Sequence, residues 1–328
     1  MSDMNAATAP NVQPAEPMAP ENAPLPPSKK PPGPWKLVWQ KFSHNPYAMT
    51  GLVVLLIFVL VAIFAKQVAP FDPAKVDMMN SNLKPGSGKH LLGTDELGRD
   101  IFSRLVYSSR ISLMVGFSVA IIAVFLGSLI GAISGYFGGW VDTIFMRLID
   151  VMISLPGLFI NILVMAIFGT KMIYLILILA LTSWTGVARL VRGQFLQLRE
   201  MQYVEAARAT GVSSWGIIFR HLLRNASFPI IVNATLMVGG AILSESGLSY
   251  LGLGIQMPQT SWGIMLSNSQ EFMLINPMLA VYPGLCILIV VLAVNFIGDG
   301  IRDALDPRQK KSRRRLAKWR KNFSKSGI

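Results

Sequence analysis

The strongest restriction on the fold comes from long apolar runs that contain almost no charged residue. A helix needs about 20 mainly apolar residues to cross the hydrocarbon core of a bilayer. Only 14% of the chain is charged, whereas soluble domains carry roughly 25%. Six runs fit a membrane span: residues 48–65, 111–136, 151–170, 172–188, 228–244 and 278–297. The sequence therefore predicts an all-α integral membrane protein with six transmembrane helices.

The two ends of the chain differ in composition from the middle. Residues 1–34 hold ten of the twenty prolines and almost no large apolar residue, so they cannot bury enough surface to offset chain entropy. The first long apolar run begins only at Ala48, which is not typical of a cleavable signal peptide, so we expect this span to stay in the membrane. We expect a disordered tail and lead-in over 1–46, a first span with its outer loop over 47–108, a five-helix core over 109–306 and a basic tail over 307–328.

The distribution of Lys and Arg predicts the orientation in the membrane. With the N-terminus inside, the inside segments hold 22 basic residues and the outside segments hold 8. Basic residues are enriched on the cytoplasmic side, so both termini are expected in the cytoplasm. Eleven of the thirty Lys and Arg lie after Asp299, beside the last span. Such a segment is typical of contact with anionic lipid headgroups, which favours membrane lipid over nucleic acid as its partner.

Residues for metal binding or covalent chemistry are sparse. The single cysteine, Cys286, lies inside an apolar run, so it is interpreted as a packing residue. The three histidines are far apart in sequence and lack helical ligand partners: His44, His90 and His221. No HExxH or GxSxG motif and no carboxylate pair lies within a span. We therefore predict no catalytic residue, no metal site and no enzyme activity in this chain.

Four glycines follow one another at four-residue spacing in and after the second predicted span: Gly127, Gly131, Gly135 and Gly139. Small residues at this spacing form a ridge on one helix face that lets a second helix approach closely. We predict helix packing, within the chain or against a partner subunit. A flexible element that moves during transport is the alternative.

Acidic residues near the spans are candidates for function, because ionisable groups are costly in a membrane. Asp142 and Asp150 flank Arg147, which favours a local ion pair or charge cluster. Glu245 follows the fifth span. It could face a translocation path or simply the aqueous interface.

The connection between the fourth and fifth spans, residues 189–225, mixes charged and apolar residues at helical spacing. Glu205, Ala206 and Ala207 are followed after three residues by Gly211, and then by an apolar stretch that includes Trp215. Two short helices broken at Gly211 would present apolar groups with no core of their own to cover. Docking on a partner and lying on lipid both fit this pattern.

This loop resembles the cytoplasmic loop of the membrane subunits of ABC importers, matching at Glu205, Ala206, Ala207 and Gly211. In that family the loop is a coupling helix that inserts into a groove of the ATPase subunit. The resemblance gives Trp215 the same role. The family pattern usually ends in Leu-Pro, whereas here Leu223 is followed by Arg224, which puts the following turn in question.

Three further stretches resemble the peptide and nickel branch of these importers, in its C-type subunit. They are LGTDELGRD at 92–100 with Ser103 to Leu105, SYLGLG at 249–254 with SWG at 261–263, and NFIGDGIRDALDPR at 295–308. The matches extend over most of the chain. They imply a type I ABC importer transmembrane fold and a permease that forms half of the pathway for di- or oligopeptides. Nickel or another small solute is the alternative.

The resemblance also implies partners and a location. We expect a heterodimer with a homologous permease, two ATPase subunits, an extracytoplasmic substrate-binding protein and a place in the bacterial cell membrane. The fragment at 86–90 has Leu83 in place of the first P-loop glycine and His90 in place of the magnesium-binding Ser or Thr. ATP and magnesium are therefore expected on the partners, with no cofactor in this chain. A self-sufficient secondary transporter is a weaker alternative, because the spans offer almost no ion-coupling residues.

Overall fold

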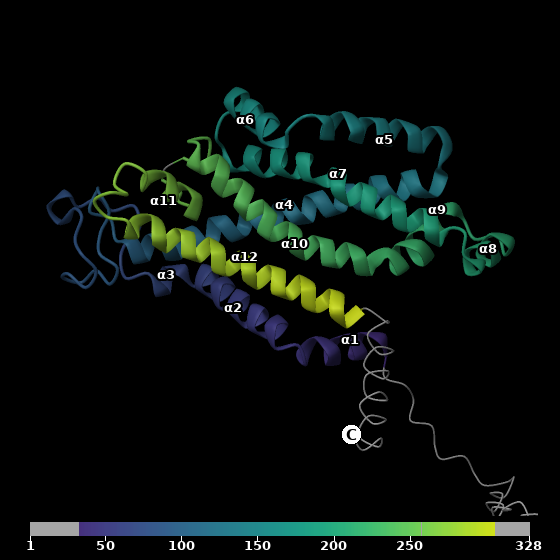
Figure 1. The fold of residues 1–328 in the computed structure, drawn as a ribbon, viewed down its shortest axis with the longest axis horizontal. Coiled ribbons are helices and arrows are strands. Elements are labelled where there is room, and N and C mark those ends of the chain that lie inside the picture. Colours follow the sequence, from purple (N-terminus) through teal and green to yellow (C-terminus); the bar gives the residue numbers. More distant parts are fainter. Residues whose placement is uncertain (1–32, 257, 306–328) are drawn as a thin grey trace, which may run out of the picture.

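The computed structural model describes residues 33–256 and 258–305, and the regular structure of that part is helical (Figure 1). The long helices are α2 (Pro46–Ile63), α4 (Ile101–Phe137), α7 (Met172–Leu198), α10 (Leu223–Tyr250) and α12 (Met278–Leu305). The shorter ones are α1 (Pro34–Ser43), α3 (Ala65–Val68), α5 (Gly139–Ser154), α6 (Gly157–Phe168), α8 (Gln202–Ala209), α9 (Ser214–Gly216) and α11 (Trp262–Asn268). A 3₁₀ turn, Met78–Asn80, and a π turn, Ile217–Leu222, complete the set.

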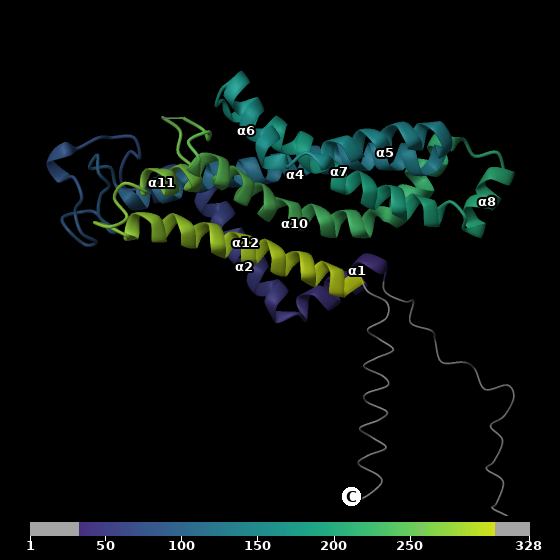
Figure 2. The same ribbon diagram turned by 45° about the horizontal axis from the view of Figure 1, so that its top comes forward.

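Five segments are long and apolar enough to cross a membrane, and a sixth is counted if the bent pair α5 and α6 forms one span. The five are Pro46–Ile63, Ile101–Phe137, Met172–Leu198, Ser214–Tyr250 and Met278–Leu305. They run side by side in an elongated bundle (Figures 1 and 2). The prediction of an all-helical membrane protein is confirmed.

The third predicted span, 151–170, is wrong as a single straight helix. α5 and α6 meet at an angle of 85°, with Leu155 and Pro156 between them. Proline lacks the backbone N–H that a helix interior needs, and it disfavours the helical conformation of the residue before it. The apolar run continues across this point, so composition alone did not reveal the break.

Two predicted boundaries also differ from the structure. α4 begins at Ile101, so the predicted boundary between 108 and 109 falls inside a helix. The side chain of Asp100 accepts the backbone N–H of Ser103 and caps this early start. α1 occupies part of the lead-in predicted over 1–46. Residues 1–32 and the basic tail over 307–328 lie outside the described residues.

α4 and α7 pack closely against each other along the glycine ridge. A Cβ atom added to Gly127, Gly131 or Gly135 would lie within 2.4–2.7 Å of backbone or side-chain atoms of α7. Gly139, the fourth predicted member, does not belong to this ridge, and a Cβ there would meet nothing within 4 Å. The reason is that α4 ends at Phe137, and the chain turns before α5 begins.

α5 is joined to α7 by two ion pairs. Asp142 pairs with Arg192, and Asp150 pairs with Arg189 at 2.6 Å. The predicted partner, Arg147, was wrong. Asp142 and Asp150 are eight residues apart, so both lie on the face that meets α7, whereas Arg147 is five residues from Asp142 and points elsewhere.

The segment 92–100 belongs to the loop before α4, and hydrogen bonds to Asp95 hold this part of the loop in one conformation. Asp95 accepts the backbone N–H groups of Leu97 and Arg99 through Oδ1. Its Oδ2 accepts Arg99 Nε at 2.7 Å and Arg104 Nη1 at 3.1 Å. Gly98 packs against the backbone of Asp77, leaving no room for a Cβ. This stretch therefore has a structural role at the start of α4.

Candidate docking site

α8 and α9 lie at one end of the bundle, and α11 lies at the opposite end (Figures 1 and 2). We call these the α8 end and the α11 end. The residues predicted from the 189–225 connection all lie at the α8 end. α8 projects past the ends of the long helices, which makes it the most prominent feature there.

One face of α8 anchors it to the bundle. Val204 and Ala207 are buried in an apolar cluster with Ile217, Ile218 and Phe195. Residues three apart share a helix face. The opposite face therefore presents Glu205 and Ala206 to solvent.

Ala207, which was predicted together with its neighbours as a coupling residue, differs from them in its exposure. Its side chain is only 8% exposed and points toward the bundle. The helical repeat explains the difference, because Ala206 and Ala207 are 100° apart around the axis. Ala207 therefore packs against the bundle, while Ala206 lies on the exposed face of α8.

Gly211 ends α8 in a conformation that favours glycine. Its φ is +78°, in the left-handed region. The N–H of Gly211 donates to the carbonyl of Arg208, and the N–H of Val212 donates to the carbonyl of Ala207, both at 3.0 Å. These two bonds form a Schellman motif, which satisfies carbonyls at the helix end. A Cβ at Gly211 would meet nothing within 4 Å, so the backbone conformation, not crowding, favours glycine here.

The chain then re-enters the bundle through α9 and the π turn. Ser213 caps α9 by accepting the N–H of Gly216 at 3.2 Å. Trp215 is 51% exposed and stacks on Phe219, with ring centroids 5.8 Å apart. Phe219 belongs to the same apolar stretch of the sequence, and its position four residues after Trp215 is typical of one helix face.

The replacement of the family's usual proline by Arg224 does not interrupt the helix at this position. α10 continues through Arg224 without interruption, and the proline inside this helix is Pro229, five residues later. Asn225 Nδ2 donates to the carbonyl of His221 at 2.9 Å and to the hydroxyl of Tyr203 at 3.1 Å. The second of these bonds links α8 to the start of α10.

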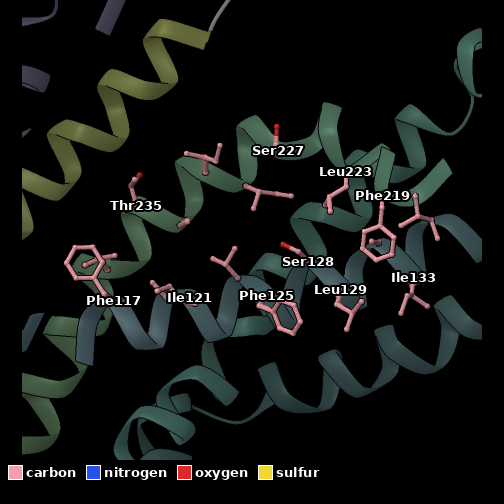
Figure 3. A pocket seen from close by; sticks show the side chains of 18 of the residues that line it. Phe117, Ile121, Phe125, Ser128, Leu129, Ile133, Phe219, Leu223, Ser227 and Thr235 are labelled. Carbon is pink, nitrogen blue, oxygen red and sulfur yellow. The ribbon is translucent and has the colours of Figure 1, made fainter. Parts of the chain in front are cut away.

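A groove of about 600 Å³ runs between α4 and α10 (Figure 3). Its lining side chains are nearly all apolar and none is charged; they include Phe117, Ile121, Phe125, Ile231 and Ala234. Trp215 and Phe219 close it at the α8 end. Ser128 Oγ lies in its wall, buried and without a hydrogen-bond partner among the described residues.

Glu245 lies near the end of α10, away from this groove. Its side chain is 0% exposed and accepts hydrogen bonds from Ser249 and Ser261, both at 2.7 Å. In this structure it faces neither an open path nor water, in contrast to both roles considered from the sequence. Within the described residues, no group of three or more His, Cys, Asp or Glu could hold a metal ion.

Comparison with known proteins identifies two family models in the chain. Residues 123–311 match the binding-protein-dependent transport system inner membrane component. Residues 33–85 match the N-terminal transmembrane domain of oligopeptide transport permease C. The first match covers α4 from Ala123 to its C-terminal end and all of the candidate docking site, and the second covers α1 to α3.

Curated relatives are similar over most of their length. The dipeptide transport system permease protein DppC of Alkalihalophilus pseudofirmus is 41% identical over 84% of this chain and 91% of its own. The glutathione transport system permease protein GsiD of Pectobacterium atrosepticum is 39% identical over 84% and 92%. The oligopeptide transport system permease protein OppC of Bacillus subtilis is 39% identical over 87% and 93%.

Proposed function

This chain belongs to the family of binding-protein-dependent transport system inner membrane components, and we propose that it forms one half of the membrane pathway of a peptide importer. Membership makes it a multi-pass transport component that works with ATPase and binding-protein partners. The sequence alone left nickel or another small solute open. The relatives named for dipeptides, oligopeptides and glutathione favour a short peptide as the substrate.

The exposed face of α8 is the proposed contact with an ATPase subunit. The observation that carries this proposal is the division of α8 into two faces. Val204 and Ala207 fix it to the bundle, while Glu205 and Ala206 remain exposed at the tip. A rigidly anchored helix with a free face can transmit force between subunits, whereas a helix lying on lipid would bury its apolar face in the membrane.

The groove between α4 and α10 is the proposed contact with a second permease subunit. Its uncharged lining suits a membrane-spanning helix. The hydroxyl of Ser128 offers a hydrogen bond to that helix. The groove also reaches Trp215 and Phe219, so it is continuous with the α8 end, where both permeases would meet their ATPases. A heterodimer with a homologous chain is the arrangement we propose.

The α8 end is proposed to face the cytoplasm, together with both termini. The excess of Lys and Arg in the connections on that side supports this orientation. Lys41 Nζ donates to the carbonyl of Ala304 at 2.7 Å, which joins α1 to the last turn of α12. The first and last described helices therefore meet on the same side of the bundle.

Purification tests the proposal directly. The chain is isolated from its native membrane in mild detergent, its co-purifying subunits are identified by mass spectrometry, and ATP hydrolysis is measured with and without the binding protein. We expect a related permease, ATPase subunits, and hydrolysis that a peptide-loaded binding protein stimulates. A complex that lacks any ATPase under gentle conditions contradicts the proposal.

A charge reversal separates docking from assembly in the membrane. Glu205→Lys should reduce the amount of co-purified ATPase subunit at least about ten-fold, because a reversed charge in a protein contact costs several kcal/mol. Glu271→Lys is the matched control, since it makes the same charge change at an exposed residue after α11. Equal ATPase recovery with both variants would show that α8 is not the docking surface.

A further inference from the structure

Glu245 is a buried acid that the proposed docking and pathway contacts leave unused. Acidic side chains are rarely buried completely unless they are paired, because removing a carboxyl group from water is costly. The partners of Glu245 are hydroxyl groups. Oε1 accepts Ser249 Oγ and Ser261 Oγ, both at 2.7 Å, and Oε2 lies 3.4 Å from Ser246 Oγ.

Ser261 is the partner that comes from outside α10. It immediately precedes α11, and its Oγ accepts the N–H of Ile264 at 3.2 Å, so it is the N-cap of that helix. The same hydroxyl donates a hydrogen bond to Glu245 Oε1. One oxygen atom therefore begins α11 and ties it to α10 at the same time.

α11 packs closely against the helices on two of its sides. A Cβ on Gly263 would lie 2.6 Å from Ser246 Cα on α10. On the other side, the backbone N–H of Trp262 donates to Ser112 Oγ, and its Nε1 donates to the carbonyl of Leu105, both at 3.2 Å. α11 is thus held between α10 and α4 by short polar contacts.

α10 connects this cluster to the opposite end of the molecule. The segment Ser214–Tyr250 is a single span of 37 residues, which corresponds to a length of about 55 Å. The irregular positions in it, the π turn Ile217–Leu222 and Pro229, lie toward the α8 end. Such positions are where helices bend. Beyond Pro229, α10 can move as one body with whatever is fixed to its far end.

We propose that Glu245 is a positioning residue that fixes α11 to α10 through Ser261, so that movement begun at the α8 end carries α11 with it. The proposal rests on the proposed function, because it gives that movement a source in the ATPase subunits. The position of α11, at the opposite end of the bundle, then depends on whether the docking site at the α8 end has moved. Glu245 acts through Ser261 and touches no substrate in this arrangement.

Three variants of the full chain, prepared in its complex, test this role. Ser261→Ala removes the bond between the two helices and leaves Glu245 bonded to Ser249. Glu245→Gln retains an oxygen acceptor of the same size and should be milder. Ser269→Ala is the control, because among the described residues this hydroxyl, just after α11, donates only to the carbonyl of Leu266 within the same helical turn.

Hydrogen exchange read by mass spectrometry gives the first measurement. With Ser261→Ala, the amides of residues 262–268 should exchange about ten-fold faster, since both a helix cap and a hydrogen bond to the Glu245 carboxyl group are lost. In Ser269→Ala these amides should exchange at the same rate as in the unsubstituted protein. An unchanged rate in Ser261→Ala overturns the proposal.

ATP hydrolysis gives the second measurement, one that a merely structural contact would not change. We expect Ser261→Ala to lose most of the stimulation by a peptide-loaded binding protein, about five-fold or more, with basal hydrolysis retained. Faster exchange in α11 with normal stimulation would overturn the role in transmission. Exchange is read on the chain itself, so absence of an ATPase from the parent complex would contradict the proposed function separately.

Discussion

Arg192 of α7 donates two hydrogen bonds to the carboxylate of Asp142 on α5, from Nε at 2.5 Å and from Nη2 at 2.6 Å. This forked geometry fixes both the distance and the rotation of one helix against the other. The same carboxylate accepts the hydroxyl of Ser134 on α4. Asp142 therefore joins three helices at one point near the turn from α4 to α5.

Removal of this carboxylate charge should loosen α5. We expect Asp142→Asn to lower the free energy of unfolding by about 1–2 kcal/mol, because the pair is charge-assisted but partly exposed. Thermal unfolding in detergent measures the loss. The control is Asp150→Asn, whose more exposed pair with Arg189 should contribute less than about 0.5 kcal/mol. Equal losses would argue against a special role for the forked contact.

The close approach of α4 and α7 should make Gly131 intolerant of any side chain. In Gly131→Ala the new Cβ would lie 2.4 Å from the carbonyl oxygen of Ala188, so the helices must separate. We expect a loss of about 1–3 kcal/mol in unfolding free energy. Gly186→Ala on α7 is the matched control, since its Cβ meets nothing within 4 Å. That change should be neutral or stabilising by up to about 1 kcal/mol. A tolerated Gly131→Ala would contradict the close contact.

The membrane spans were predictable because a long apolar run is a local property of the sequence. The glycine ridge was predictable for the same reason, up to the point where the chain leaves α4 before Gly139. The partner of Asp142 was not, since Arg192 lies 50 residues away and only the packing of α5 on α7 brings them together. The enclosure of Glu245 depends in the same way on Ser261 from the following loop.

At the proposed docking site, the sequence pattern predicted the segment but not which of its side chains face outward. The motif spacing predicted Glu205, Ala206 and Gly211 as a group, and the resemblance gave them a role. The helical repeat then separates Ala207 from them, because that side chain packs against Ile217 and Ile218. The neighbouring apolar residues that anchor α8 come from α7 and the π turn, and sequence alone does not place these beside it.

The left-handed turn at Gly211 should distinguish substitutions by their backbone preference. Gly211→Asn should retain coupling, because asparagine tolerates a φ of +78° better than other residues. Gly211→Val should cost about 1–2 kcal/mol locally and displace Glu205 relative to α9. We expect the valine variant to lose binding-protein-stimulated ATP hydrolysis while its membrane insertion, measured by membrane fractionation, stays normal. The same activity in both variants would exclude a role for this turn.

The groove between α4 and α10 provides the last prediction, which concerns the second permease. Ala234→Trp introduces a large side chain from α10 into the groove, where a partner helix would have to lie. A helix contact made by close packing cannot accommodate an added ring without separating. We therefore expect the recovery of the second permease to fall at least about ten-fold in co-purification, while the thermal stability of this chain is unchanged or higher. Leu56→Trp on α2 is the control, since Leu56 is 54% exposed and lies outside the groove. Full recovery of the second permease with Ala234→Trp would mean that the partner contacts another face and that lipid fills this groove.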